Sequence, residues 1–76
     1  MLLPIQVKLA RTALGWGVRE LAQHAGVAPS TVTRFEAGRG GMQAATLARV
    51  ERCLEEGGVI FVGADASGGP GVRLKG

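Results

Sequence analysis

The stretch Val18–Gly38 reads VRELAQHAGVAPSTVTRFEAG and contains two short helical patterns on either side of Gly26. In each pattern, apolar or small residues recur three and four positions apart, which places them on one helix face. These inward positions are Leu21, Ala22, Ala25, Val32 and Phe35. A glycine between the patterns allows a sharp backbone turn, because it has no side chain to obstruct one. Two helices that cross at a large angle through such a turn form a helix-turn-helix motif.

The expected starts of both helices fit this motif. Gly17 is an acceptable N-cap, and Glu20 lies three residues later, where its carboxylate can accept a hydrogen bond from the cap N–H. Pro29 occupies the first position of the second helix, where its missing N–H costs no hydrogen bond. Ala28 is a poor cap, so this second start is the weaker of the two.

The flanking sequence predicts a mainly α fold of four helices followed by a short β-hairpin. The expected helices cover residues 5–15, 18–25, 29–37 and 43–56. The apolar run Val59–Val62 and the segment Val72–Lys75, in which apolar and basic residues alternate, flank a glycine-rich loop, which is typical of a hairpin. We therefore expect a helical domain over residues 1–58 and a hairpin extension over residues 59–76. Because an isolated two-stranded hairpin is marginal in water, we expect this one to support a homodimer.

Positive charge is concentrated in the half of the chain that carries the motif. The 76 residues have a net charge of +3 and a pI of about 10.0, a value typical of nucleic-acid binders. Residues 1–40 hold five lysines and arginines against two glutamates, whereas residues 41–76 hold four charges of each sign. Such a distribution favours a surface that faces phosphates.

The motif resembles the Cro/lambda-repressor-type helix-turn-helix family of small bacterial and phage transcriptional regulators. The resemblance covers about residues 5–57 and depends on the spacing of five positions and on the run Arg34–Gly38. The five positions are Ala22, Gly26, Val27, Val32 and Phe35. It implies a lambda-repressor-like fold in which Arg11 pairs with Glu36 and ties the first helix to the third. The alternative is that both residues are solvated charges.

The helix over residues 29–37 is the predicted recognition helix, since the second helix of the motif lies in the major groove of DNA. Its outward positions Ser30, Thr33 and Arg34 are the expected base contacts, and an arginine can donate two hydrogen bonds to guanine. The expected phosphate contacts are Arg19, Thr31, Arg39 and Gln43. The family often has a glutamine that holds a phosphate where this chain has Val18, so we expect that contact to be missing or to be made by Arg19. It often has a polar or basic residue near Ala28 and Pro29, whose side chains cannot donate, so the list of base contacts is short.

Other chemistry finds little support in the sequence. Trp16 is expected to close the first interhelical turn rather than to stack on bases, and His24 to be a solvated surface group. Cys53 lies in an apolar helix stripe and excludes an intrachain disulfide because it is the only cysteine. We expect no metal site, no cofactor and no enzymatic activity. The absence of a signal-like start and of a long apolar run predicts a cytoplasmic protein.

Together these patterns predict a sequence-specific protein that binds double-stranded DNA as a homodimer on a palindromic operator and acts as a repressor-like regulator. An alternative remains open, in which the chain is the antitoxin of a toxin–antitoxin pair and its C-terminal segment binds a toxin protein.

Overall fold

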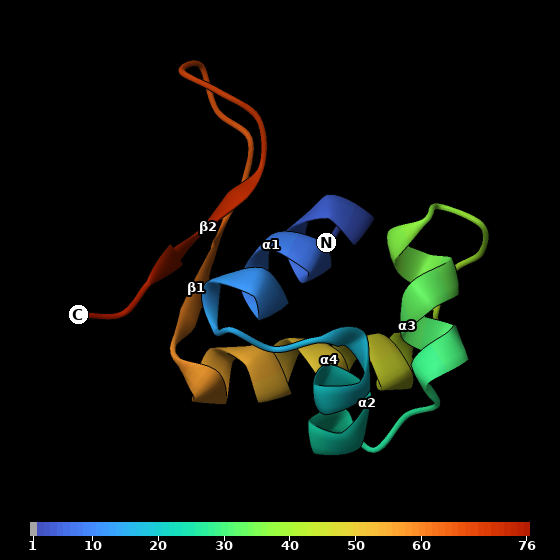
Figure 1. Ribbon diagram of the computed structural model, residues 1–76. Coiled ribbons are helices and arrows are strands. Elements are labelled where there is room, and N and C mark those ends of the chain that lie inside the picture. The colour runs from blue at the N-terminus through green and yellow to red at the C-terminus, as the bar shows by residue number, and fades with distance from the viewer. Residues whose placement is uncertain (1) are drawn as a thin grey trace.

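The computed structural model describes residues 2–76, and Met1, the first residue of the predicted N-terminal domain, lies outside them. Four helices are followed by an antiparallel two-stranded hairpin (Figure 1). The predicted mainly α fold is therefore confirmed. The elements are α1 (Pro4–Ala13), α2 (Val18–Ala25), α3 (Pro29–Glu36), α4 (Ala44–Gly57), β1 (Val59–Val62) and β2 (Gly71–Leu74).

Helix α2 has the predicted bounds, α3 begins at the predicted residue, and the other helix ends differ from the predicted bounds by one or two residues. Glycines explain the main differences. Helix α1 stops at Ala13 rather than at residue 15 because Gly15 has a φ of +74°. The Trp16 N–H then donates to the Arg11 carbonyl at 2.7 Å, which closes the helix end. Helix α4 extends through Gly57, and Gly58 ends it with a φ of +117°.

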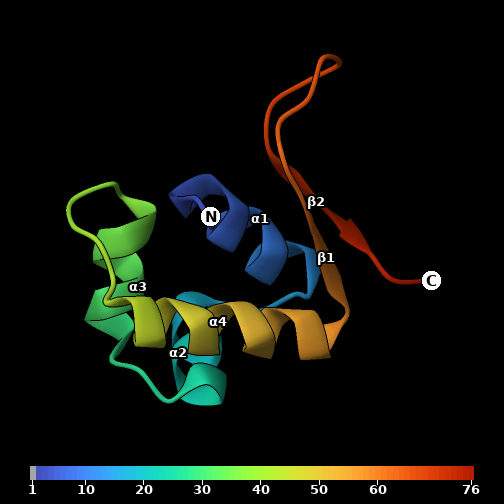
Figure 2. The same ribbon diagram turned by 180° about the vertical axis from the view of Figure 1, so that it is seen from behind.

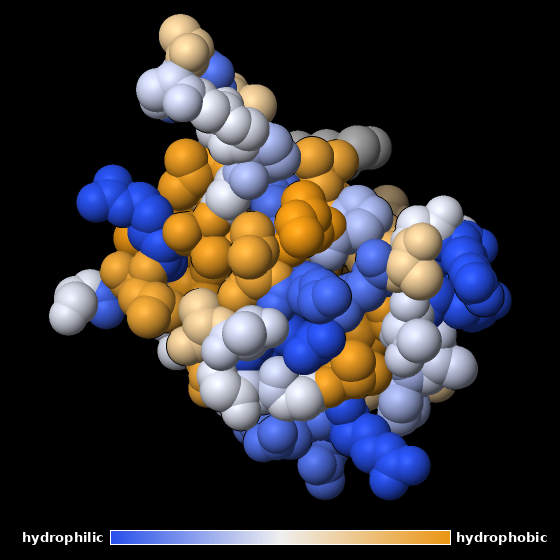
Figure 3. All heavy atoms as spheres, turned by 45° about the horizontal axis from the view of Figure 1, so that its top comes forward, coloured by the Kyte–Doolittle hydropathy of each residue, from blue (hydrophilic) through white to orange (hydrophobic). Residues whose placement is uncertain are grey.

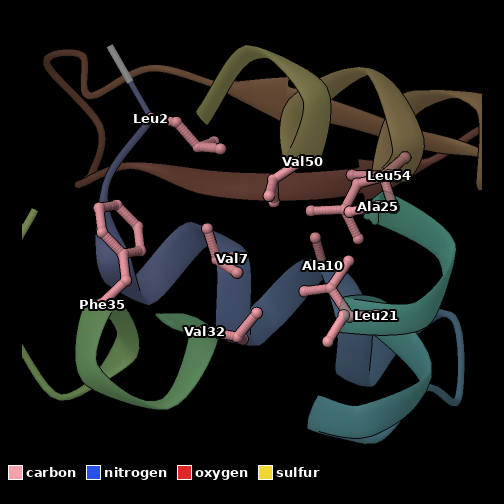
Figure 4. Close-up of a cluster of buried hydrophobic side chains, with 11 residues drawn as sticks. Leu2, Val7, Ala10, Leu21, Ala25, Val32, Phe35, Val50 and Leu54 are labelled. Carbon is pink, nitrogen blue, oxygen red and sulfur yellow. The ribbon is translucent and has the colours of Figure 1, made fainter. Parts of the chain in front are cut away.

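One apolar core joins the helices to the hairpin. Each helix and strand β1 contribute fully buried side chains to it: Val7, Leu21, Val32, Val50, Leu54 and Val59. Figure 4 shows side chains from α1, α3 and α4 converging on this core. Burial of one such side chain stabilises the fold by about 1.5–3 kcal/mol, so the core is the main source of stability.

The hairpin packs on α1 and α4 and shares their core. Its register pairs Val59 with Leu74 and Phe61 with Val72. The buried Gln6 side chain fixes the hairpin to α1, since its Nε2 donates to the Val62 carbonyl at 3.1 Å and to the Gly71 carbonyl at 3.2 Å. No pattern in the sequence points to this glutamine.

The turn between α1 and α2 is closed by Trp16, as expected for a core anchor. This indole is half-buried against the core and stacks on the His24 ring, with a centroid distance of 4.3 Å and an interplanar angle of 11°. His24 is exposed, as expected for a surface group, and one face of its ring lies on the indole. The stack therefore links the α1–α2 turn to the last turn of α2.

Helix α3 and the hairpin lie at opposite ends of the molecule, and α4 spans the distance between them (Figures 1 and 2). The first turns of α4 lie beside α3, and its last turn leads into β1. This arrangement separates the predicted recognition surface from the predicted dimerisation element.

Candidate nucleic-acid interface

The connection between α2 and α3 has the geometry of a tight helix-turn-helix turn. Gly26 ends α2 with a φ of +71°, a conformation that costs a glycine little. The Val27 N–H donates to the Ala22 carbonyl at 2.9 Å, and Pro29 then begins α3. Three residues, Gly26 to Ala28, are thus enough to redirect the chain into the next helix.

A side-chain hydrogen bond caps the start of α2 but not the start of α3. The Gly17 N–H donates to the Glu20 carboxylate at 2.9 Å, as the capping pattern predicted. Ala28 provides no side-chain cap to α3, in agreement with the weak start expected there. The orientation of α3 therefore depends on contacts made further along this helix.

Helix α3 is anchored by two buried side chains and one ion pair. Val32 and Phe35 are buried in the core, at 0% and 6% exposure. Arg11 donates from Nε to Glu36 Oε2 at 2.7 Å and from Nη2 to Glu36 Oε1 at 2.9 Å. A third bond runs from Arg11 Nη1 to the Trp16 carbonyl at 3.3 Å. The hydrogen bond with Glu36 raises the pKa of Arg11 above its ordinary value, so the guanidinium stays charged.

The opposite face of α3 is open to solvent. The three expected base contacts, Ser30, Thr33 and Arg34, are all exposed. The Thr33 hydroxyl donates to the Pro29 carbonyl at 3.2 Å, so its proton is already used within the helix. Thr33 can still accept a hydrogen bond or contact a thymine methyl group, which leaves it two ways to contact a base.

The expected phosphate contacts do not form one cluster. Thr31 and Gln43 line a groove between α3 and the start of α4, together with Arg34. Arg19 lies on α2, and Arg39 follows α3, where its N–H donates to the Arg34 carbonyl at 2.9 Å. Both of these arginines are exposed, so they extend the basic surface on either side of α3.

Two residues of the groove were missed by the sequence analysis, namely Thr46 and Arg49. A signal for them exists, because Gln43, Thr46 and Arg49 are spaced three residues apart and therefore follow one side of α4. The spacing alone does not show that this side of α4 lies beside α3.

Positive charge on this surface is not neutralised within residues 2–76. Within these residues Arg11 and Glu36 form a salt bridge, whereas Arg19, Arg34 and Arg39 have no carboxylate partner. Unpaired guanidinium groups beside an exposed helix can bind the phosphates that flank a base sequence.

Other kinds of site are less well supported by the described part of the chain. Its histidine, cysteine and acidic residues do not gather into a group of three that could hold a metal ion. Cys53 is half-buried, and its burial and then the nearby Glu56 raise the pKa of the thiol. No helix among residues 2–76 has the length and apolarity needed to cross a membrane.

Comparison with known proteins agrees with this geometry. A family model described as a helix-turn-helix domain matches residues 3–56, which include all four helices except the last residue of α4. No curated protein matches the chain significantly. The matched segment covers well over half of the chain, and the chain therefore belongs to the helix-turn-helix family of DNA-binding domains.

Proposed function

We propose that this protein is a sequence-specific, repressor-like regulator of the Cro/lambda-repressor type, which binds double-stranded DNA as a homodimer. One observation carries the proposal. The outer face of α3 presents Ser30 and Arg34 to solvent, while Val32, Phe35 and the Arg11–Glu36 pair hold its inner face in place. A rigid helix with free donors on its outer face suits base recognition in the major groove.

The hairpin end of the molecule supports the homodimer. Among the described residues, five large apolar side chains are exposed: Leu3, Ile5, Leu9, Ile60 and Leu74. Three of them lie on or beside α1 and two lie in the hairpin, and Figure 3 shows hydrophobic surface gathered in this region. A second copy that covers this surface would leave α3 free, because α3 lies at the other end of the molecule (Figure 1).

A palindromic operator follows from such a dimer. A two-fold axis through the hairpin end relates two copies of α3, and recognition helices about 34 Å apart can enter successive major grooves. Occupation of such a site within a promoter would block transcription, which is the repressor-like activity we propose.

Selection of bound duplexes from a randomised DNA pool at about 0.15 M salt tests the proposal, because that salt concentration weakens non-specific binding. Enrichment of a palindrome supports a base-reading dimer, and its half-site spacing reports the distance between the two α3 helices. Binding without enrichment would contradict sequence-specific recognition. Enrichment of a single half-site would support base reading and contradict the dimer.

A further inference from the structure

The groove between α3 and α4 has an ordered lining that the base-reading role of α3 does not explain. From one side, Ala28, Thr31 and Arg34 face it at intervals of three residues. From the other side, Gln43, Thr46 and Arg49 do so at the same interval. Because residues three apart lie on one side of a helix, two rows of side chains face each other across what we call the α3–α4 groove.

The charges of the α3–α4 groove are of one sign. Arg34 and Arg49 both line it, none of its lining residues is acidic, and neither arginine forms a salt bridge within residues 2–76. Two guanidinium groups that face the same space repel each other, and an anion between them would be attracted by both. The groove is therefore electrostatically suited to an anion.

Hydroxyl groups add a more specific preference. Thr31 and Thr46 are half-buried at the groove and can donate hydrogen bonds into it. Thr33, by contrast, directs its hydroxyl to the Pro29 carbonyl and does not line the groove. The N–H donors of arginine guanidinium groups and the threonine hydroxyls together match the several acceptor oxygens of a phosphate group.

We propose that the α3–α4 groove binds a phosphate group, with Arg49 and Thr46 as its principal contacts. The inference rests on the proposed function, since a DNA strand that passes α3 would place its phosphates beside Arg34 and therefore at the mouth of the groove. Arg49 then neutralises the phosphate, and Arg34 remains available for a base. A free phosphate ion has the same chemistry, so the experiment includes it as a separate probe.

The first measurement is the affinity of the R49Q variant for duplex DNA between 50 and 200 mM salt. Loss of one phosphate contact reduces the slope of log K against log salt by about 0.9, so the advantage of the wild type shrinks about 3.5-fold over this range. The loss is expected to be equal for operator and random duplexes, because a phosphate contact carries no sequence information. The T46V variant keeps the side-chain shape and is expected to weaken binding without changing the slope as much.

The matched control is R52Q, which removes the same charge from the same helix at an exposed residue outside the groove. Circular dichroism of each variant ensures that only folded protein is compared. A slope change in R49Q that is absent from R52Q supports the groove as a phosphate site on DNA. Equal changes in both variants would overturn that assignment, because general electrostatic attraction would explain them.

The second measurement is titration of the protein without DNA with inorganic phosphate at constant ionic strength, followed by the NMR signals of the arginine Nε–H groups. A shift confined to Arg34 and Arg49 supports a site that takes free phosphate. No shift, together with identical DNA binding by R49Q and R52Q, would refute the groove as a phosphate site. Failure of the wild type to select any DNA sequence would instead contradict the proposed function.

Discussion

Replacing Arg11 with methionine tests how far the ion pair with Glu36 holds the recognition helix in place. The substitution keeps an unbranched apolar stem but removes the two hydrogen bonds to Glu36, at 2.7 and 2.9 Å, and the bond to the Trp16 carbonyl. Helix α3 would then lose its polar connection to α1 and would be held by Val32 and Phe35 alone.

The burial of the pair determines the expected loss. Exposed ion pairs contribute about 0–1 kcal/mol, whereas removal of one partner from a buried pair costs about 3–5 kcal/mol. The side chains of Arg11 and Glu36 are only 16% and 8% exposed, so Arg11→Met would leave a nearly buried carboxylate without its partner. We therefore expect a loss of about 3 kcal/mol, a large part of the roughly 4–11 kcal/mol typical of a chain of this length.

Urea denaturation followed by circular dichroism measures the free energy of unfolding, and Lys8→Met is the matched control. Lys8 is an exposed residue of the same helix and has no salt-bridge partner within residues 2–76. Its replacement is expected to change the stability by less than about 0.5 kcal/mol. A cycle with Glu36→Gln and the double variant isolates the pairwise coupling, for which we expect about 2 kcal/mol.

A loss below about 1 kcal/mol for Arg11→Met, with a coupling near zero, would refute this reasoning. The pair would then behave as an ordinary surface salt bridge, and its low exposure would not be a guide to its energy. The orientation of α3 would have to be attributed to its two buried side chains.

Three further perturbations test the recognition helix, the hairpin and its turn. Arg34→Ala is expected to relax the preference at one base position by about 1–3 kcal/mol, and an unchanged selected sequence would remove Arg34 from the base contacts. Gln6→Leu removes the two hydrogen bonds to the hairpin and the one from the Leu3 N–H, so it should lower the free energy of unfolding, measured by urea denaturation, by about 3 kcal/mol. The control Gln23→Leu changes an exposed residue and should change this free energy by less than about 0.5 kcal/mol. Hydrogen bonds from Ser67 lower the pKa of Asp65. The hairpin turn should therefore be fully ordered above the ordinary aspartate pKa of about 3.9, and it should loosen as the pH falls through the lower pKa of the folded state. Amide NMR shifts in the turn that do not move with pH would contradict this.

The sequence by itself determined the elements and their order. Apolar residues spaced three and four apart predicted the helices. An apolar run and an alternating segment on either side of a glycine-rich loop predicted the hairpin. These signals are local, because each depends on the geometry of a few neighbouring residues. The helix ends were less accurate, since Gly15 and Gly58 terminate α1 and α4 through backbone conformations that the apolar pattern does not encode.

The partners of polar side chains were decided by tertiary structure. Gln6 contacts carbonyls 56 and 65 positions away, and Thr46 and Arg49 join Arg34 at one groove only because α4 begins beside α3. The Arg11–Glu36 pair was expected from a family resemblance, and no local pattern connects residues 25 positions apart. Hydrogen bonds and ion pairs need donor and acceptor atoms about 3 Å apart, to within a few tenths of an ångström. Atoms of distant residues come this close only after the core has brought the helices together.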